Sequence, residues 1–319
     1  MTTSGIDRRE ALELIACEGP ELLELIARAG RTRLERRGDE VVPCAIINAK
    51  CGLCSQDCAF CAQSARSTAE IERFPLKPTE VLVAESRAAA EMGACRIGLV
   101  TSGKSVKPGP ELETIAGVIE VIAAELPSEP CASLGVLDRP ALERLRDAGL
   151  TRYHHNLETA ESFFREVCTT RSWRESVDTA VDARAAGLAV CCGGIFGLGE
   201  SPAQRVELLA TLAELELDSI PLNFLHPIPG TPLGERASIP ALECVKVVAV
   251  ARLMMPDREV RVCGGRERNM RDLQSWALLA GADGLMIGGY LTTTGRTVAD
   301  DLRMVRDAGF RVATRSRGT

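Results

Sequence analysis

Short apolar runs of four to seven residues recur along this chain, and most are separated by stretches long enough for an amphipathic helix. Apolar runs of this length are typical of parallel strands that are buried on both faces. We count eight, at residues 44–50, 95–100, 131–134, 152–156, 189–193, 219–223, 259–263 and 284–287. Strands that alternate with helices in this way predict a parallel sheet with crossover helices.

Glycines mark the ends of the predicted helices. Five of them follow an alanine or a methionine where a helix should stop, at Gly93, Gly149, Gly187, Gly281 and Gly309. Glycine is common just past a helix C-terminus because it adopts the left-handed conformation at little cost. The eight strand–helix units predict an α/β fold, a (β/α)8 TIM-type barrel with an N-terminal helical extension. A doubly wound open sheet is the alternative.

The same pattern predicts the domain boundaries. Residues 1–40 form the N-terminal helical extension, with one helix near residues 8–28, and residues 41–312 form the barrel. Residues 313–319 form a polar tail that we expect to fray. Barrel chemistry lies at the C-terminal ends of the strands and in the loops that follow them, so candidate functional residues are expected there.

Composition excludes several classes of protein. Hydrophobic residues make up 45% of the chain and charged residues 26%, which is typical of globular proteins. The net charge of −6 and an aromatic content of 3% argue against a nucleic-acid binder. No apolar run approaches the roughly 18 residues of a membrane helix, and the first ten residues lack the apolar segment of a secretory signal. We therefore expect a cytoplasmic protein with no membrane or nucleic-acid partner.

Cysteine is abundant, with 13 residues, an odd number that excludes complete intramolecular pairing. Three of them, Cys54, Cys58 and Cys61, form a C-x3-C-x2-C motif in the loop after the first predicted strand. Clustered thiols in a reducing compartment indicate metal binding or catalysis. Soft thiolates select zinc, Cu(I) or iron–sulfur centres. Cys51 could supply the fourth ligand of a structural zinc, although such sites favour two separated pairs of ligands.

This motif after the first strand of a barrel resembles that of the radical S-adenosylmethionine (SAM) superfamily. The resemblance implies that Cys54, Cys58 and Cys61 hold a [4Fe-4S] cluster whose open iron binds SAM. It also implies that an electron from the cluster cleaves SAM to methionine and a 5′-deoxyadenosyl radical.

The rest of the chain is similar to the biotin synthase family. The similarity is carried by residues 58–64, 153–159, 169–171, 191–200, 221–223, 249–256 and 260–266. It implies the insertion of sulfur into dethiobiotin, with two hydrogen abstractions and therefore two SAM molecules. The sulfur would come from an auxiliary iron–sulfur cluster inside the barrel. The family also implies a homodimer and an electron donor such as flavodoxin or ferredoxin.

The resemblance implies ligands for the auxiliary cluster on three strands. Cys131, Cys191 and Arg261 match family ligand positions. The family's usual cysteine on the second strand is Gly98 here, whereas Cys263 stands where serine is usual. The auxiliary cluster is therefore expected to be [2Fe-2S] or larger, with Cys263 as an added ligand. The alternatives are an ion pair across the barrel for Arg261 and simple core packing for Cys131 and Cys263.

The resemblance also implies polar contacts at the barrel mouth. The expected SAM-binding residues are Asn156, Glu158, Arg171, Gly193 and Gly194. The expected dethiobiotin-binding residues are His154, Asn156 and Asn223. An amide suits a ureido ring because it offers both a donor and an acceptor. A surface ion pair for Arg171 and an ordinary hydrogen-bonded barrel histidine for His154 are equally good interpretations.

Strand alternation separates the remaining candidates. His155 is expected to face the helices, and Cys192 to point out of the barrel unless the strand end bends. The cysteines expected to be structural are Cys17, Cys44, Cys95, Cys168 and Cys244. Two other functions stay open, namely a different radical SAM enzyme on the same barrel and a non-enzymatic iron–sulfur carrier. Cys131 and Cys191 together favour the sulfur-inserting enzyme.

Overall fold

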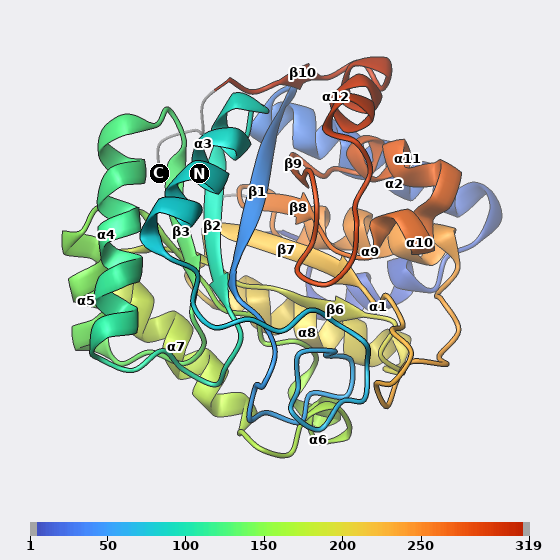
Figure 1. The fold of residues 1–319 in the computed structure, drawn as a ribbon. Coiled ribbons are helices and arrows are strands. Elements are labelled where there is room, and N and C mark those ends of the chain that lie inside the picture. Colours follow the sequence, from blue (N-terminus) through green and yellow to red (C-terminus); the bar gives the residue numbers. More distant parts are fainter. Residues whose placement is uncertain (1–4, 315–319) are drawn as a thin grey trace.

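The computed structural model describes residues 5–314 (Figure 1), so residues 315–319 of the predicted polar tail lie outside the described part. The chain begins with two helices, α1 (Arg8–Ile15) and α2 (Gly19–Arg37). The single helix predicted near residues 8–28 is therefore wrong. Pro20 stands in the first turn of α2. A proline inside a continuous helix would clash with the carbonyl four residues earlier, so the chain starts a new helix instead.

Eight parallel strands form a closed barrel. They are β1 (Glu40–Lys50), β2 (Arg96–Thr101), β3 (Glu129–Ser133), β4 (Arg152–His154), β5 (Ala189–Cys191), β7 (Ser219–Phe224), β8 (Glu259–Val262) and β9 (Gly284–Met286). Each coincides with a predicted run. The pairing of β1 with β9 closes the sheet, which confirms the (β/α)8 barrel and rules out the open sheet. Two short strands were not predicted: β6 (Gly194–Phe196) pairs with β7, and β10 (Arg311–Val312) pairs with β1.

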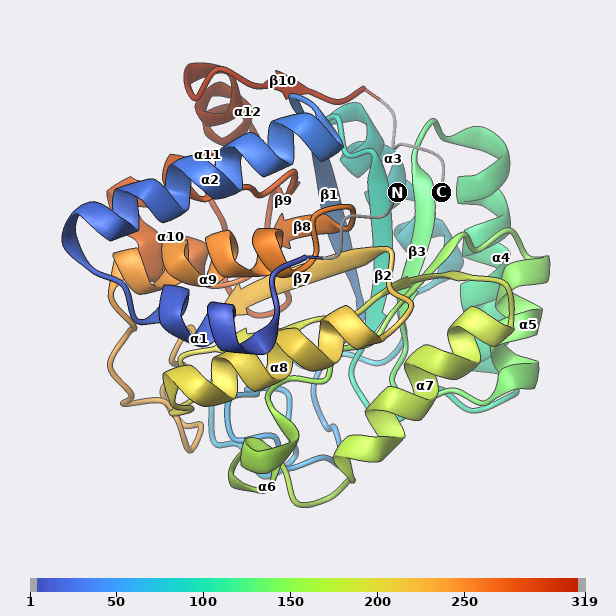
Figure 2. The ribbon, with the colours of Figure 1, turned by 180° about the vertical axis from the view of Figure 1, so that it is seen from behind.

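Helices surround the strands. The longer ones are α3 (Thr79–Glu91), α4 (Pro110–Glu125), α5 (Arg139–Asp147), α7 (Trp173–Ala185), α8 (Pro202–Glu214), α9 (Ala241–Met254) and α12 (Val298–Asp307). Shorter ones are α6 (Phe164–Val167), α10 (Arg266–Met270), α11 (Gln274–Leu279) and two 3-10 turns, η1 (Glu161–Phe163) and η2 (Arg271–Leu273). The N-terminal helices α1 and α2 pack on α8 and α9 at the back of the barrel (Figure 2). Among residues 5–314, no helix is long and apolar enough to cross a membrane.

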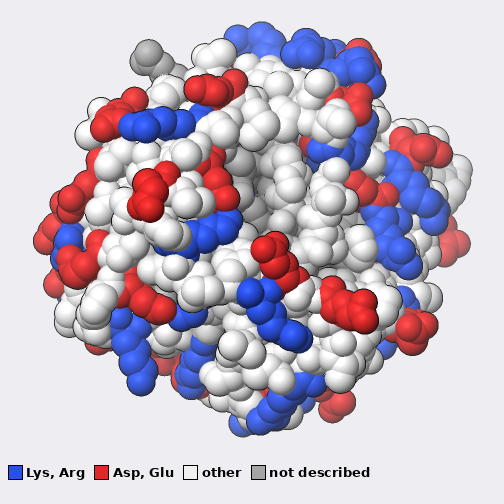
Figure 3. Space-filling view, viewed as in Figure 1, with Lys and Arg blue, Asp and Glu red and all other residues white. Residues whose placement is uncertain are grey.

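The hydrophobic core lies mainly between strands and helices, whereas charged groups plug the N-terminal end of the barrel. There the Glu259 carboxylate accepts from Arg96 Nη1 at 2.6 Å and from Arg261 Nε at 3.1 Å. Arg96 also donates to Glu129 at 2.9 Å. The face seen in Figure 3 is hollowed near its centre, and charged side chains flank the hollow. A cavity lined by strand ends and loops is thus left for the functional site.

Candidate active site

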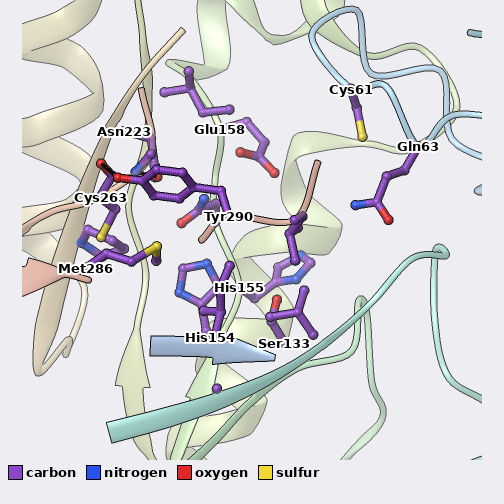
Figure 4. Close-up of a pocket in the computed structure, with 18 of the residues that line it drawn as sticks. Cys61, Gln63, Ser133, His154, His155, Glu158, Asn223, Cys263, Met286 and Tyr290 are labelled. Carbon is purple, nitrogen blue, oxygen red and sulfur yellow. Dashed lines mark hydrogen bonds between the residues drawn. The ribbon is translucent and has the colours of Figure 1, made fainter. Parts of the chain in front are cut away.

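Most of the residues singled out in the sequence line this one cavity. They are Cys54, Cys58, Cys61, Cys131, His154, Asn156, Glu158, Arg171, Cys191, Asn223, Arg261 and Cys263. Figure 4 shows Cys61 and Gln63 on one side of the cavity and Cys263 and Met286 on the other. The Glu158 carboxylate lies between the two sides (Figure 4). The loop cysteines and the strand cysteines therefore face a common space.

Backbone hydrogen bonds hold the cysteine loop in shape. The Cys54 N–H donates to the Gln63 carbonyl at 2.9 Å, and the Cys54 carbonyl accepts from the Ala65 N–H at 2.8 Å. The Cys61 N–H donates to the Cys58 carbonyl at 3.0 Å in a tight turn. These bonds satisfy backbone groups that no strand or helix partners. They fold the three thiols of the motif onto one side of the loop.

Asp57 ties this loop to the segment before α7. Its carboxylate accepts from the backbone N–H groups of Thr169 and Thr170 at 2.9 and 3.1 Å. Burial alone would raise the pKa of Asp57, but these donors hold it well below its usual range. The ionised carboxylate therefore anchors the loop at neutral pH.

The thiols of Cys58 and Cys61 are protonated at neutral pH. A hydrogen bond with Cys168 and burial raise the pKa of Cys58, and burial raises the pKa of Cys61 to about 11. The same hydrogen bond lowers the pKa of Cys168 to about 5. Cys168, expected to be structural, also donates to Asp57 Oδ1 in the cysteine loop at 3.3 Å. Because a metal binds the thiolate, loading this loop must release protons.

The three motif cysteines, Cys54, Cys58 and Cys61, all line the cavity. Within residues 5–314, no three His, Cys, Asp or Glu side chains converge as a preformed single-ion site. In an iron–sulfur cluster each thiolate binds a different iron. The [4Fe-4S] cluster expected at these cysteines and the zinc alternative both stay predictions.

Glu158 presents an unused acceptor to the cavity. The residue adopts φ +68°, and its carbonyl accepts from the Ile195 N–H at 2.7 Å, which fixes this turn. Its Oε1 lies 3.4 Å from Arg171 Nη2, while Oε2 has no partner within the described residues. Burial raises the pKa of Glu158. A buried acceptor without a donor fits a ligand that brings hydroxyl groups, as SAM would.

Arg171 is buried rather than on the surface, so the surface ion pair considered for it is wrong. Its Nη1 donates to Ser176 Oγ at 2.5 Å and lies 3.3 Å from His155 Nε2. His155 also lines the cavity, against the expectation that it faces the helices. The reason is that β4 ends at His154, so the strict alternation of a strand no longer applies.

The neighbouring His154 contacts the strand cysteines. Its Nδ1 lies 3.4 Å from Cys191 Sγ. Burial lowers the pKa of His154 to about 4, so the imidazole is neutral at pH 7. A neutral ring keeps one nitrogen as a donor and one as an acceptor for a polar substrate.

Backbone contacts orient the two amides. Asn156 Oδ1 accepts from the Gly193 N–H at 3.2 Å. Asn223 Nδ2 donates to the Gly194 carbonyl at 3.2 Å, and its Oδ1 accepts from the Gly264 N–H at 3.0 Å. An added Cβ would lie 1.9 Å from the Pro221 carbonyl at Gly193 and 2.6 Å from the Glu158 carbonyl at Gly194. The glycines thus let the strands that carry these amides approach closely, and their predicted SAM contacts stay predictions.

The barrel interior holds one more thiol than the sequence predicted. Cys131 and Cys191 point inward, and Cys263 follows β8 into the cavity. Cys44, expected to be structural, also lines the cavity. Cys95 instead donates to the Ala313 carbonyl at 3.2 Å, outside the barrel. The sequence missed Cys44 because β1 is buried on both faces, so its apolar pattern does not show which face is inside.

Two buried arginines accompany these thiols. Arg261 is paired with the Glu259 carboxylate, two residues earlier on β8, and not with a group across the barrel as the sequence alternative had it. Arg152 is 3% exposed, and its Nε and Nη1 have no hydrogen-bond partner among the described residues. A buried guanidinium with two nitrogens that make no hydrogen bond is costly, so this position suits an anionic group beside Cys131. An iron–sulfur cluster held by thiolates is such a group.

Comparisons with known proteins agree with this site. Residues 51–212 match the Radical SAM superfamily, and residues 221–311 match the Biotin and Thiamin Synthesis associated domain. A biotin synthase of Geobacter sulfurreducens is 52% identical over 97% of this chain and 94% of its own length. A biotin synthase of Trichlorobacter lovleyi is 49% identical over 97% of this chain and 93% of its own length.

Solved structures share the fold. A methylornithine synthase superposes with a TM-score of 0.85 at 20% identity, covering 98% of this chain and 95% of that one. An FeFe-hydrogenase maturase of Carboxydothermus hydrogenoformans superposes with a TM-score of 0.83 at 21% identity, covering 97% and 76%. At such low identity these likenesses support the barrel and not a particular reaction.

Proposed function

The chain belongs to the biotin synthase family of radical SAM enzymes, and from this membership we propose that it inserts sulfur into dethiobiotin to form biotin. The observation that carries the proposal is the common cavity, which loop cysteines line on one side and strand cysteines on the other. Other radical SAM enzymes on this barrel share the loop motif but need not keep cysteines on both β3 and β5, as Cys131 and Cys191 are kept here.

Cys54, Cys58 and Cys61 would hold the [4Fe-4S] cluster, and Cys131, Cys191 and Cys263 the auxiliary cluster. When bound, the first cluster supplies the electron that cleaves SAM, and the second supplies the sulfur. The ligand role predicted for Arg261 stays a prediction, since its guanidinium is paired with Glu259 here.

The chain's own polar groups would position the organic molecules. Glu158 Oε2 is free to accept from the SAM hydroxyls, and Arg171 lies beside it with a charge that suits a carboxylate. Asn156, His154 and Asn223 line the same cavity and would orient the ureido ring. The buried walls exclude water, which protects a carbon radical from side reactions.

Activity assays can test this proposal. Anaerobically reconstituted protein with SAM, a strong reductant and dethiobiotin is expected to yield biotin and 5′-deoxyadenosine. Cys54→Ala should abolish both products, whereas Cys131→Ala should still form 5′-deoxyadenosine and lose biotin. SAM cleavage without any biotin in the parent protein would refute the sulfur-insertion function.

Four further expectations accompany the proposal. The electron donor is a flavodoxin or a ferredoxin, the assembly is a homodimer, and the protein works in the cytoplasm. The auxiliary cluster is [2Fe-2S] or larger. These expectations rest on family membership, and analytical ultracentrifugation of the loaded protein would measure the oligomeric state.

A further inference from the structure

Strand register places Cys44 in the same row as a predicted cluster ligand. Cys44 of β1 pairs with Met286 of β9. On the other side of β9, Arg261 pairs with Gly284 and Val262 with Leu285, so the next residue, Cys263, comes level with Met286. Cys44 and Cys263 therefore flank Met286, each about 4.8 Å from it across the sheet.

The surroundings of Cys44 are those of the predicted cluster site. Its side chain is 6% exposed and lines the cavity. Cys191, Arg261 and Cys263 line the same cavity. The Arg261 charge acts on the Cys44 thiol, and the charges of Cys44 and Cys263 act on each other. Four thiols, from β1, β3, β5 and the end of β8, thus surround one part of the barrel.

The neighbouring strand lacks the thiol that the family usually has there. A Cβ at Gly98 would lie 3.4 Å from Ile46 Cγ2 and 4.0 Å from Cys131 Cβ, so this position faces the interior and has room for a side chain. Gly98 pairs with Ile46, two residues beyond Cys44 on β1. Cys44 and Ile46 therefore face the same side of β1. The thiol that is absent at Gly98 of β2 is thus present on β1, two residues before the position that pairs with Gly98.

Arg261 is poorly placed to be a ligand itself. Its Nε donates to Glu259 Oε1 at 3.1 Å, and its Nη2 contacts the same oxygen. A guanidinium binds a metal only after it loses a proton, and a buried carboxylate beside it stabilises the charged form. A soft thiolate is the better ligand for iron. Arg261 and Arg152, whose Nε and Nη1 make no hydrogen bond among the described residues, can instead offset the negative charge of a thiolate-bound cluster.

We propose that Cys44 is the fourth thiolate ligand of the auxiliary cluster, together with Cys131, Cys191 and Cys263. Arg261 and Arg152 are positioning residues that balance the charge of this cluster. The inference rests on the proposed function, because it assumes a sulfur-donating cluster inside the barrel. Each thiol gives up its proton to solvent when it binds iron.

The test isolates the barrel cluster by removing the other one. The starting protein, called the parent, carries Cys54→Ala, Cys58→Ala and Cys61→Ala and is reconstituted anaerobically. Its iron and sulfide are measured per chain, and the state of its iron is recorded by Mössbauer spectroscopy. Adding Cys44→Ala should lower the iron retained against a chelator by about tenfold, in the range seen when weaker metal-site contacts are lost. The matched control is Cys95→Ala, because Cys95 is a buried thiol outside the barrel. This variant should keep the iron of the parent.

Folding is checked separately, by circular dichroism and thermal midpoint of each iron-free variant. If Cys44→Ala does not fold, Cys44→Ser, which conserves volume, takes its place. Iron X-ray absorption of the parent should fit sulfur neighbours alone. A nitrogen neighbour that disappears in Arg261→Lys would overturn the inference.

The remaining outcomes separate the two proposals. If Cys131→Ala loses iron and Cys44→Ala keeps the iron and spectrum of the parent, the inference is wrong and the sulfur-inserting function stands. If the parent variant binds no iron in the barrel, the function itself is wrong.

Discussion

Individual side chains in this barrel take their protonation state from burial. Burial lowers the pKa of His154 to about 4 and that of His155 to about 3, so both rings are neutral at pH 7. The same effect raises the pKa of Glu158. Neutral rings beside a charged Arg171 avoid a second buried cation in a cavity that must receive the sulfonium of SAM.

His155 should make the protein less stable in acid. The unfolded chain takes up a proton at His155 below pH 6.5, whereas the folded protein resists it until about pH 3. The free energy of unfolding should therefore fall between these values, by at most about 1.4 kcal/mol per pH unit for this residue. Urea unfolding of iron-free protein from pH 7 to 4 should show a shallower decline in His155→Gln. Equal slopes for the two proteins would contradict the assignment.

Hydrogen bonds between connecting segments hold the cysteine loop in place. The Asp57 carboxylate joins the loop of Cys54, Cys58 and Cys61 to Thr169 and Thr170. Helix α7 then begins at once, with a capping box formed by Ser172 and Glu175. The ionised Asp57 side chain thus links the first βα loop to the fourth, together with a backbone bond from the Ala59 N–H to the Val167 carbonyl at 2.9 Å.

Asp57→Asn should loosen the cysteine loop. An amide provides one acceptor oxygen in place of two and loses the charge that strengthens the hydrogen bonds, at a cost of about 1–3 kcal/mol. Hydrogen exchange of residues 51–66 in the iron-free protein should accelerate, while exchange in α4 should not. The control is Arg66→Gln, because the Arg66–Asp57 ion pair is largely exposed and contributes little. Similar acceleration in both variants would argue against a backbone anchor.

At the scale of the whole molecule, the barrel interior is divided along its axis. Charged side chains close the N-terminal end around Glu259, thiols occupy the middle, and amides and carboxylates lie at the mouth. Parallel strands put their C-terminal ends on one face, so ligands collect there and the opposite end is left to stability.

Glu259→Gln should therefore destabilise the fold. The variant leaves the guanidinium groups of Arg96 and Arg261 buried with a neutral neighbour, which typically costs roughly 3–5 kcal/mol. Thermal and urea unfolding of the iron-free protein measures the loss. Glu129→Gln removes a more exposed partner of Arg96 and should cost much less. A Glu259→Gln protein as stable as the parent would show that the buried charges of Arg96, Glu259 and Arg261 contribute no net stability.

Local patterns in the sequence were sufficient for the elements and for the first metal motif. All eight barrel strands were predicted, because apolar runs and the glycines that end helices can each be recognised within a few residues of sequence. The motif of Cys54, Cys58 and Cys61 was equally clear, since its spacing fits within one loop. The break between α1 and α2 was missed although Pro20 marked it.

Only the tertiary structure decided which buried residues share the cavity. Cys44 and Cys95 both lie in or beside apolar strands, and nothing local separates the one that lines the barrel from the one that packs outside it. A barrel strand is buried on both faces, so alternation gives two equivalent assignments. The pairing of β1 with β9 closes the barrel and determines which of the two faces of β1 points inside. The pairing of Arg96 on β2 with Glu259 on β8 likewise depends on where the closed barrel places each charge.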